Sequence, residues 1–274
     1  PFPGSRKLAR VLAHLLLPRP HSPVAVPTVF DFSLLIHPRW HTDVYYLGFY
    51  ERGTLEVMSA CLRPGDTFVD VGAHVGLMSL FAAQCVGPQG KVWAFEPVAS
   101  LYELLQASIR INGFTQIEAF RYALGDREGE VPIFLGGSCP TLSKPEKHGA
   151  VEWVQLRSLD VVLGPQPPLV RMIKIDVEGY EEQVIRGASR LLASKRAPIV
   201  CLEYAPVTHS DGRDPLAVFQ ILKSLQPYRF FQLKKTKSTP SPLVACSAES
   251  LRKNDNVFAI PEYLLSELSP SLFG

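Results

Sequence analysis

The chain has 274 residues, which suits one α/β domain with additions and a large buried core. Its net charge of +2 gives no electrostatic reason to expect a nucleic-acid partner, and no segment is long and apolar enough to span a bilayer. The five cysteines are scattered and form no C-x-x-C pair, which predicts reduced thiols and a cytoplasmic location.

Residues 1–63 are expected to form an N-terminal region with a helix, a proline-rich linker and a cap. Ser5 to Leu17 places basic residues ahead of leucine-rich turns. This pattern suits a membrane-surface helix or, as we favour, a packing helix that can support a homo-oligomer. The alternating stretch Thr28 to Ile36 predicts one strand, and Glu51 to Leu62 predicts a helix. A cluster of tyrosines precedes that helix, and its position would allow it to cover the site of the next domain. For most of these tyrosines we favour a packing role.

The stretch from Asp66 to Leu80 organises the rest of the chain. Its apolar, β-branched run over 67–71 predicts a buried parallel strand, and the helix that follows is expected over 77–85. Two glycines four residues apart lie between them. Gly72 permits a tight turn from strand to helix, and Gly76 permits a close approach of the first helical turn.

Two acidic residues end neighbouring strands in this part of the chain. Asp70 stands at the end of the first strand, and Glu96 ends the next apolar run, 91–95. Glu96 follows Gly76 by about twenty residues, the interval at which a carboxylate reaches the ribose hydroxyls of a bound nucleoside. An ordinary turn with a chance acid is the alternative, and the matching strand ends favour a nucleoside cofactor.

The glycine spacing narrows the class of nucleoside. Dinucleotide-binding turns use G-x-G-x-x-G, because a pyrophosphate must lie against bare backbone. Here the spacing is G-x-x-x-G, with Met78 and Ser79 where a phosphate would need less bulk, and no phosphate-loop motif is present. The turn therefore favours a phosphate-free nucleoside such as S-adenosylmethionine (AdoMet) over the dinucleotide of a small-molecule oxidoreductase.

Downstream, strands alternate with helices, which predicts a parallel, doubly wound sheet. The expected strands cover 67–71, 91–95, 117–121, 170–175 and 198–202, and the expected helices cover 77–85, 100–111, 158–163, 179–194 and 214–225. Tyr228 to Leu233 and Asn256 to Ile260 are expected to pair as an antiparallel edge. Ala123 and Leu124 follow the third strand and suit an adenine face.

The alternation is interrupted between Glu130 and Asp160. Val131 to Leu135 and Val151 to Arg157 both predict short strands, which we interpret as a β-hairpin insertion. The connection from Gly136 to Gly149 is rich in glycine, serine and proline. It suits a mobile lid or specificity element and, equally, a simple surface excursion.

Three more acids, Asp176, Glu178 and Glu203, lie at or just beyond later strand ends, where an open α/β sheet delivers its side chains to one crevice. Asp176 could orient or deprotonate an acceptor hydroxyl, or share a divalent cation with Glu203. Glu178 has two possible roles that the sequence does not distinguish: it lines the site, or it caps the helix that follows. Tyr204 stands where Asn or Asp would strengthen a metal site, so we predict a metal-independent reaction.

Three motifs together resemble the FkbM family of AdoMet-dependent methyltransferases: Phe68 to Gly76, Ala94 to Pro97, and Ile173 to Glu181. The resemblance covers the chain from Pro64 to Pro206. It implies a Rossmann-like, seven-stranded methyltransferase domain over 64–274. It also implies O-methylation of a hydroxyl on a sugar, a polyketide or another small metabolite.

The resemblance also implies site residues. By position, Asp70, Gly72, Gly76 and Glu96 would bind AdoMet, and we add Ala73, His74, Pro97, Ala123 and Leu124. His74 stands where the family usually has Asn. Asp176 and Glu178 would line the reaction centre, with Glu203 beside them as a third candidate. A non-catalytic module that keeps an AdoMet pocket remains the alternative to an enzyme.

Overall fold

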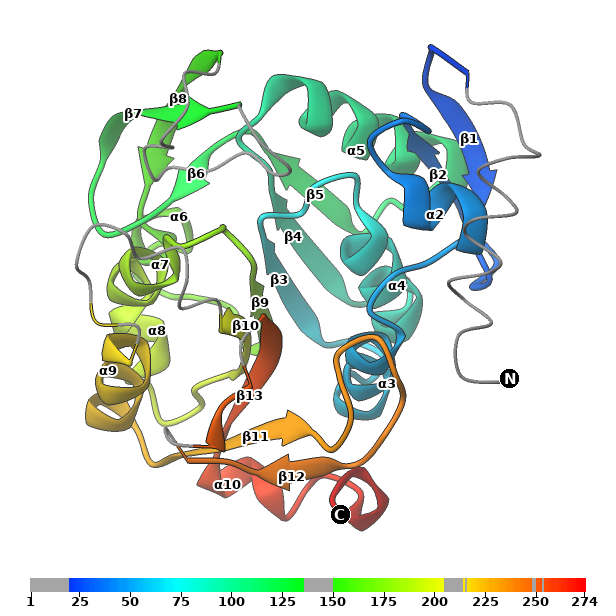
Figure 1. Ribbon diagram of the computed structural model, residues 1–274. Coiled ribbons are helices and arrows are strands. Elements are labelled where there is room, and N and C mark those ends of the chain that lie inside the picture. The colour runs from blue at the N-terminus through cyan, green and yellow to red at the C-terminus, as the bar shows by residue number, and fades with distance from the viewer. Residues whose placement is uncertain (1–19, 136–149, 205–213, 215, 248–249, 253) are drawn as a thin grey trace.

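The structure is a computed structural model that describes residues 20–135, 150–204, 214, 216–247, 250–252 and 254–274 (Figure 1). The helix expected over Ser5 to Leu17 and the connection from Gly136 to Gly149 lie outside the described residues.

A mixed sheet of eight strands forms the centre of the molecule, in the order β12-β11-β13-β10-β9-β3-β4-β5 (Figure 1). Its strands are β3 (Thr67–Val71), β4 (Lys91–Phe95), β5 (Ile117–Phe120), β9 (Val170–Ile175), β10 (Ile199–Tyr204), β11 (Tyr228–Leu233), β12 (Leu243–Ala245) and β13 (Asp255–Pro261). The five strands from β5 to β10 run parallel, whereas β13 is antiparallel to both β10 and β11. The predicted doubly wound sheet with an antiparallel last strand is therefore confirmed.

The far end of the sheet differs from the prediction in one respect. β13 pairs with β11 as expected, and it is the inner strand of the two, because it lies between β10 and β11. All seven of its residues are buried, which requires cover on both faces and neighbours on both sides. The edge is instead β12, an additional short strand that pairs with β11.

Helices cover both faces of the sheet. One face packs against α3 (Arg52–Cys61), α4 (Leu77–Val86) and α5 (Ala99–Asn112). The other packs against α6 (Leu159–Val162), α7 (Glu181–Gly187), α8 (Ser189–Leu192) and α9 (Ala217–Leu225). Every residue of β3 is buried, as its apolar run predicts for a strand covered on both faces. The C-terminal end adds α10 (Glu262–Leu265) and the 3₁₀ helix η3 (Pro270–Leu272).

The cap begins with a hairpin of β1 (Val24–Pro27) and β2 (Ser33–Ile36), followed by α2 (Thr42–Leu47). The single strand predicted from Thr28 to Ile36 is thus wrong in its first half. The Thr28 hydroxyl and amide both donate to the Phe32 carbonyl, which closes a turn there. β2 then lies along α5, where the Ser108 hydroxyl accepts a hydrogen bond from the Leu35 amide.

The predicted β-hairpin insertion is present as a separate three-stranded sheet. β7 (Gly129–Phe134) and β8 (Val151–Arg157) pair antiparallel, and β6 (Ala123–Leu124) pairs parallel with β8. Among the described residues, no helix has the length and apolar character needed to cross a membrane.

Candidate functional site

A cavity of about 530 Å³ opens at the carboxyl ends of β3, β4 and β9. Gly72 follows β3, Glu96 follows β4 and Asp176 follows β9, and all three line the cavity. His41 reaches it from the cap, and Lys237 reaches it from the connection between β11 and β12. The strand order therefore brings Glu96 and Asp176 to one cavity, although about eighty residues separate them in the sequence.

Gly72 turns the chain from β3 toward α4. Its φ is +82°, and a Cβ atom added to it would lie 2.0 Å from the carbonyl oxygen of Asp176. The amides of Gly72 and Ala73 both donate to the Phe95 carbonyl at 2.9 Å. The turn is thereby fixed between the ends of β4 and β9, and only glycine fits there.

His74 and Gly76, two further residues of the turn, have different roles. His74 lines the cavity with a φ of +55°, a left-handed conformation that Asn, Asp and His tolerate better than most residues. A Cβ at Gly76 would lie 2.6 Å from a Leu105 methyl, so Gly76 allows α4 to pack closely on α5. Neither Gly76 nor Ala73 lies on the cavity wall.

Glu96 is a buried carboxylate on the cavity wall, with 4% of its surface exposed. Its Oε2 accepts from the His74 amide at 2.8 Å and its Oε1 accepts from the Val98 amide at 3.0 Å. Burial raises the pKa of Glu96 to about 7, although both hydrogen bonds favour the charged form. The carboxylate is fixed in direction and retains lone pairs for a ligand.

Asp70 lies behind the wall rather than on it. Its Oδ2 accepts from the Ser79 hydroxyl of α4 at 2.6 Å, and burial raises its pKa. Its Oδ1 has no hydrogen-bond partner among the described residues. The structure thus places Asp70 where it joins β3 to α4, without direct access to the cavity.

Apolar residues form one side of the cavity. Pro97 lines it together with Ala123 and Leu124, the two residues that the sequence predicted for an adenine face. Tyr122, which was not among the predicted site residues, also lines the cavity, and the Arg157 guanidinium lies 5.1 Å from the centre of its ring.

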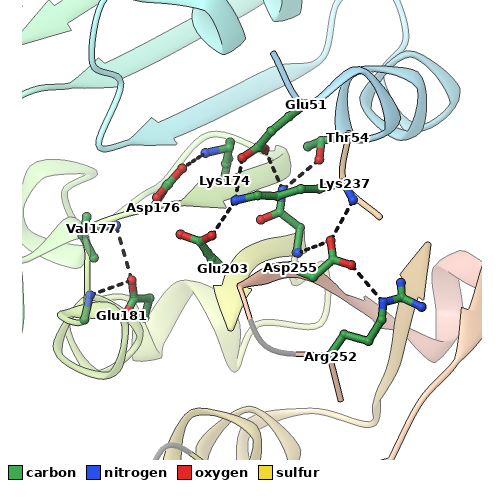
Figure 2. Close-up of polar contacts among 12 residues, drawn as sticks. Glu51, Thr54, Lys174, Asp176, Val177, Glu181, Glu203, Lys237, Arg252 and Asp255 are labelled. Carbon is green, nitrogen blue, oxygen red and sulfur yellow. Dashed lines mark hydrogen bonds and ion pairs between the residues drawn. The ribbon is translucent and has the colours of Figure 1, made fainter. Parts of the chain in front are cut away.

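Figure 2 shows a second group of charged residues, of which Glu51, Asp176 and Lys237 line the cavity. The Lys174 ammonium lies 2.7 Å from Asp176 Oδ2. The Lys237 ammonium lies 2.8 Å from Glu51 Oε1 and 2.5 Å from Glu203 Oε1. Each of the two ammonium groups is thus bound to at least one carboxylate, so that positive and negative side chains alternate in this group.

These pairs set the protonation of the acids. Burial alone would raise the pKa of Asp176, but the Lys174 ammonium beside it holds that pKa below its ordinary value. Burial and the neighbouring Asp176 raise the pKa of Glu203. Carboxylate oxygens of Asp176, Glu178 and Glu203 lie within 4.8 Å of one another, a spacing that would also suit a metal ion.

Glu178 lines the cavity in a left-handed conformation, with a φ of +53°. A neighbouring acid, Glu181, is the first residue of the helix that follows, α7. The Oε1 of Glu181 accepts from the Gly179 amide at 3.1 Å and the Val177 amide at 3.4 Å (Figure 2). The acid that stabilises the helix start is therefore distinct from the one at the site.

Several cavity residues escaped sequence reasoning. Lys237 belongs to a lysine-rich stretch that favours a solvated turn, but its side chain is bound to two carboxylates and only 20% exposed. Lys174 offered a signal, since it is a cation inside an otherwise apolar strand. Trp40 and His41 offered none, because the fold alone brings the cap to the cavity.

Comparison with known proteins adds an independent line of evidence. The profile of the methyltransferase FkbM domain matches residues 70–230. Methyltransferase 1 of Beauveria bassiana is 26% identical over 57% of this chain and 72% of its own length. The hexuronic acid methyltransferase AglP of Haloferax volcanii is 26% identical over 62% of this chain and 68% of its own length.

A solved structure shares the same family description. The crystal structure of methyltransferase FkbM from Methylobacillus flagellatus KT aligns with a TM-score of 0.49 and 17% sequence identity. The alignment covers 75% of this chain and half of that chain.

Proposed function

Because this chain belongs to the methyltransferase FkbM family, we propose that it transfers the methyl group of AdoMet to a hydroxyl of a small acceptor molecule. AdoMet is the methyl donor of this family's reaction, so the class of reaction is methyl transfer rather than hydride transfer from a dinucleotide.

The residues on the cavity wall fit this cofactor. Glu96 offers a buried, oriented carboxylate for the two ribose hydroxyls, and Pro97, Ala123 and Leu124 offer an apolar face for adenine. Gly72 keeps the turn between them free of a side chain. We assign Glu96 to direct contact, whereas Asp70, Ala73 and Gly76 support the turn from behind.

The observation that carries O-methylation is the ionised carboxylate of Asp176 in the same cavity as Glu96. A hydroxyl attacks a sulfonium methyl in line and must lose its proton in doing so. A carboxylate within hydrogen-bond reach orients that hydroxyl and accepts its proton, a contribution of about 10²- to 10⁴-fold in rate. Because Lys174 holds Asp176 ionised, we assign it first to orienting the hydroxyl. Glu178 lies next to it on the cavity wall, whereas Glu203, predicted for the site, lies within 4.8 Å of both but is bound to Lys237 and does not line the cavity.

The acceptor class follows from the polarity of the site and from one relative. A cavity with several carboxylates and with Trp40 on its wall suits a polyhydroxylated ring, which donates hydrogen bonds and stacks on aromatic side chains. AglP of Haloferax volcanii is named for a hexuronic acid. We therefore place sugars first, followed by polyketides and other small metabolites.

The test is transfer of labelled methyl from AdoMet to acceptors. Neutral sugars, uronic acids and fractionated cell extract would be incubated with the protein and methyl-labelled AdoMet, and the linkage of the product assigned by NMR. We expect label on an oxygen, and loss of turnover in Asp176→Asn with AdoMet affinity retained. Tight AdoMet binding with no transfer to any fraction would favour the non-catalytic module, and label on nitrogen or carbon would overturn O-methylation.

A further inference from the structure

Two imidazoles meet at the cofactor end of the cavity. His41 comes from the cap, just before α2, and His74 comes from the turn between β3 and α4. Their ring centres are 4.8 Å apart and their planes cross at 69°. Both side chains line the cavity, and His41 is only 7% exposed.

The ring nitrogens that face the cavity are not used by the protein. Nδ1 of His41 lies 3.1 Å from both the amide nitrogen and the carbonyl oxygen of His37, which fixes the ring. In the tautomer that the proposal requires, Nδ1 accepts from the His37 amide and Nε2 carries the proton that a ligand can accept. Within the part of the chain that the structure describes, neither His41 Nε2 nor the ring of His74 has a hydrogen-bond partner. Burial lowers the pKa of both residues to about 4, so at neutral pH each ring is uncharged and carries one N–H donor.

The position of these rings relates them to one part of AdoMet. The backbone amide of His74 donates to Glu96, so the backbone of His74 lies beside the carboxylate assigned to the ribose, and its ring lies within electrostatic reach of Asp176. The methionyl end of the cofactor extends from the ribose and carries a carboxylate, which needs hydrogen-bond donors. Lys237 is the one Lys or Arg among the described residues of the cavity wall, and Glu51 and Glu203 already bind it. The two imidazoles, whose cavity-facing ring nitrogens are not used by the protein, are therefore available as donors.

We propose that His41 of the cap, together with His74, binds the carboxylate of the amino-acid end of AdoMet. This inference rests on the proposed AdoMet site and deepens it. It makes the segment before α2 part of the cofactor site, outside the residues 70–230 that match the family profile.

The test compares two ligands that differ only at the end in question. S-adenosylhomocysteine has the amino acid, whereas methylthioadenosine has the same adenosine and sulfur without it. Calorimetry would measure both ligands on the wild type, on His41→Phe, which keeps a ring without nitrogen, and on His41→Gln, whose amide can replace Nε2. His21→Ala, a change at an exposed cap histidine, is the matched control.

We expect His41→Phe to weaken S-adenosylhomocysteine at least about tenfold, because the loss of a hydrogen bond to a charged group is of that size, with methylthioadenosine unchanged within about twofold. His41→Gln should recover most of the loss and His21→Ala should match the wild type. Methylthioadenosine binding also shows that each variant is folded. Equal weakening of both ligands, or of neither, would overturn the role of His41. A wild type that binds neither ligand would overturn the AdoMet site itself.

Discussion

The Lys174 ammonium lies 2.7 Å from Asp176 Oδ2, and the two residues stand two positions apart at the end of β9. Alternate residues of a strand share a face, so this spacing aims both side chains at the same crevice. Lys174 is almost fully buried and Asp176 is 24% exposed, so the cation lies below and the carboxylate faces the cavity. The pair keeps Asp176 ionised and fixed in direction where the acceptor must bind.

Replacing Lys174 with Met should move the acidic limb of the pH–rate profile to higher pH. The wild-type carboxylate loses its charge only as the pH falls through a pKa held below the ordinary value. Without the ammonium, burial dominates and raises that pKa, so a higher pH is needed to ionise Asp176. The measurement is kcat against pH with saturating AdoMet.

Two further variants keep this test interpretable. Lys174→Arg retains the charge and should keep the acidic limb near its wild-type position. Removal of one partner from a buried ion pair costs about 3–5 kcal/mol of stability, whereas removal of both costs less. The double variant Lys174→Met/Asp176→Asn should therefore unfold at a higher temperature than Lys174→Met alone. An unchanged acidic limb in a folded Lys174→Met would remove Lys174 from the control of Asp176.

The affinity for S-adenosylhomocysteine should fall as the pH is lowered through about 7. Glu96 has a raised pKa of about 7 in the unliganded protein, and ribose hydroxyls donate to its ionised form. Below that pH the carboxylate must release a proton on binding, so affinity should drop about tenfold between pH 8 and pH 6. Calorimetry across that range tests this, and proton release can be measured in buffers of different ionisation enthalpy.

Glu96→Gln supplies the control for that profile. It should weaken binding at pH 8 by ~1.5–3 kcal/mol and flatten the pH dependence, because Gln does not titrate. The two cavity histidines titrate at about 4, outside this window. Wild-type affinity in Glu96→Gln would remove the ribose assignment.

Gly72→Ala should abolish AdoMet binding, and Gly65→Ala should not. Both glycines have a positive φ, +82° and +89°, so both substitutions carry a backbone penalty of about 1–2 kcal/mol. A Cβ at Gly72 would also lie 2.0 Å from the Asp176 carbonyl, whereas a Cβ at Gly65 meets nothing within 4 Å. Only Gly72→Ala should therefore displace the backbone at Asp176, and only that variant should lose AdoMet affinity. Calorimetry measures the affinity, and thermal unfolding reports the shared strain. Equal AdoMet affinity in the two variants would contradict the steric argument.

Local sequence signals predicted the half of the fold that carries the cofactor. Each of the strands β3, β4 and β9 has an apolar run with an acid at or next to its end. Both features can be recognised from a few consecutive residues. The position of β13 between β10 and β11 was not predictable in the same way. It depends on which antiparallel neighbours pair over long range, and a buried strand looks the same in sequence at either place.

The residues of the site also differ in whether a local sequence signal predicts them. Gly72 and Glu96 were found because a turn and a strand end require them locally. Lys237 and His41 were missed because they reach the cavity from segments far away in sequence, and a lysine among lysines gives no sign of burial. Asp70 was predicted to contact the cofactor, but it binds Ser79 of α4 behind the cavity wall. A position at the end of a strand does not show which side of the turn the acid faces.

Turnover should be unaffected by removal of divalent cations. The sequence argument for this rested on there being only two acids, and the structure adds a third, because Asp176, Glu178 and Glu203 come within 4.8 Å. The prediction now rests on charge instead. Lys174 already binds Asp176 at 2.7 Å and Lys237 binds Glu203 at 2.5 Å, so a cation would have to displace or approach two ammonium groups.

The experiment is dialysis of the protein against EDTA, followed by single-turnover methyl transfer with and without added Mg²⁺. We expect equal rates before and after chelation. Asp176→Asn should lower kcat by about 10²- to 10⁴-fold and leave the affinity for S-adenosylhomocysteine unchanged, because the amide neither accepts the proton nor contacts the ribose. Glu182→Gln, which removes a carboxylate paired with Arg186 on the outer side of α7, is the control for a general loss of negative charge. Activity lost in EDTA and restored by Mg²⁺ would instead make Asp176, Glu178 and Glu203 the ligands of a metal that orients the acceptor.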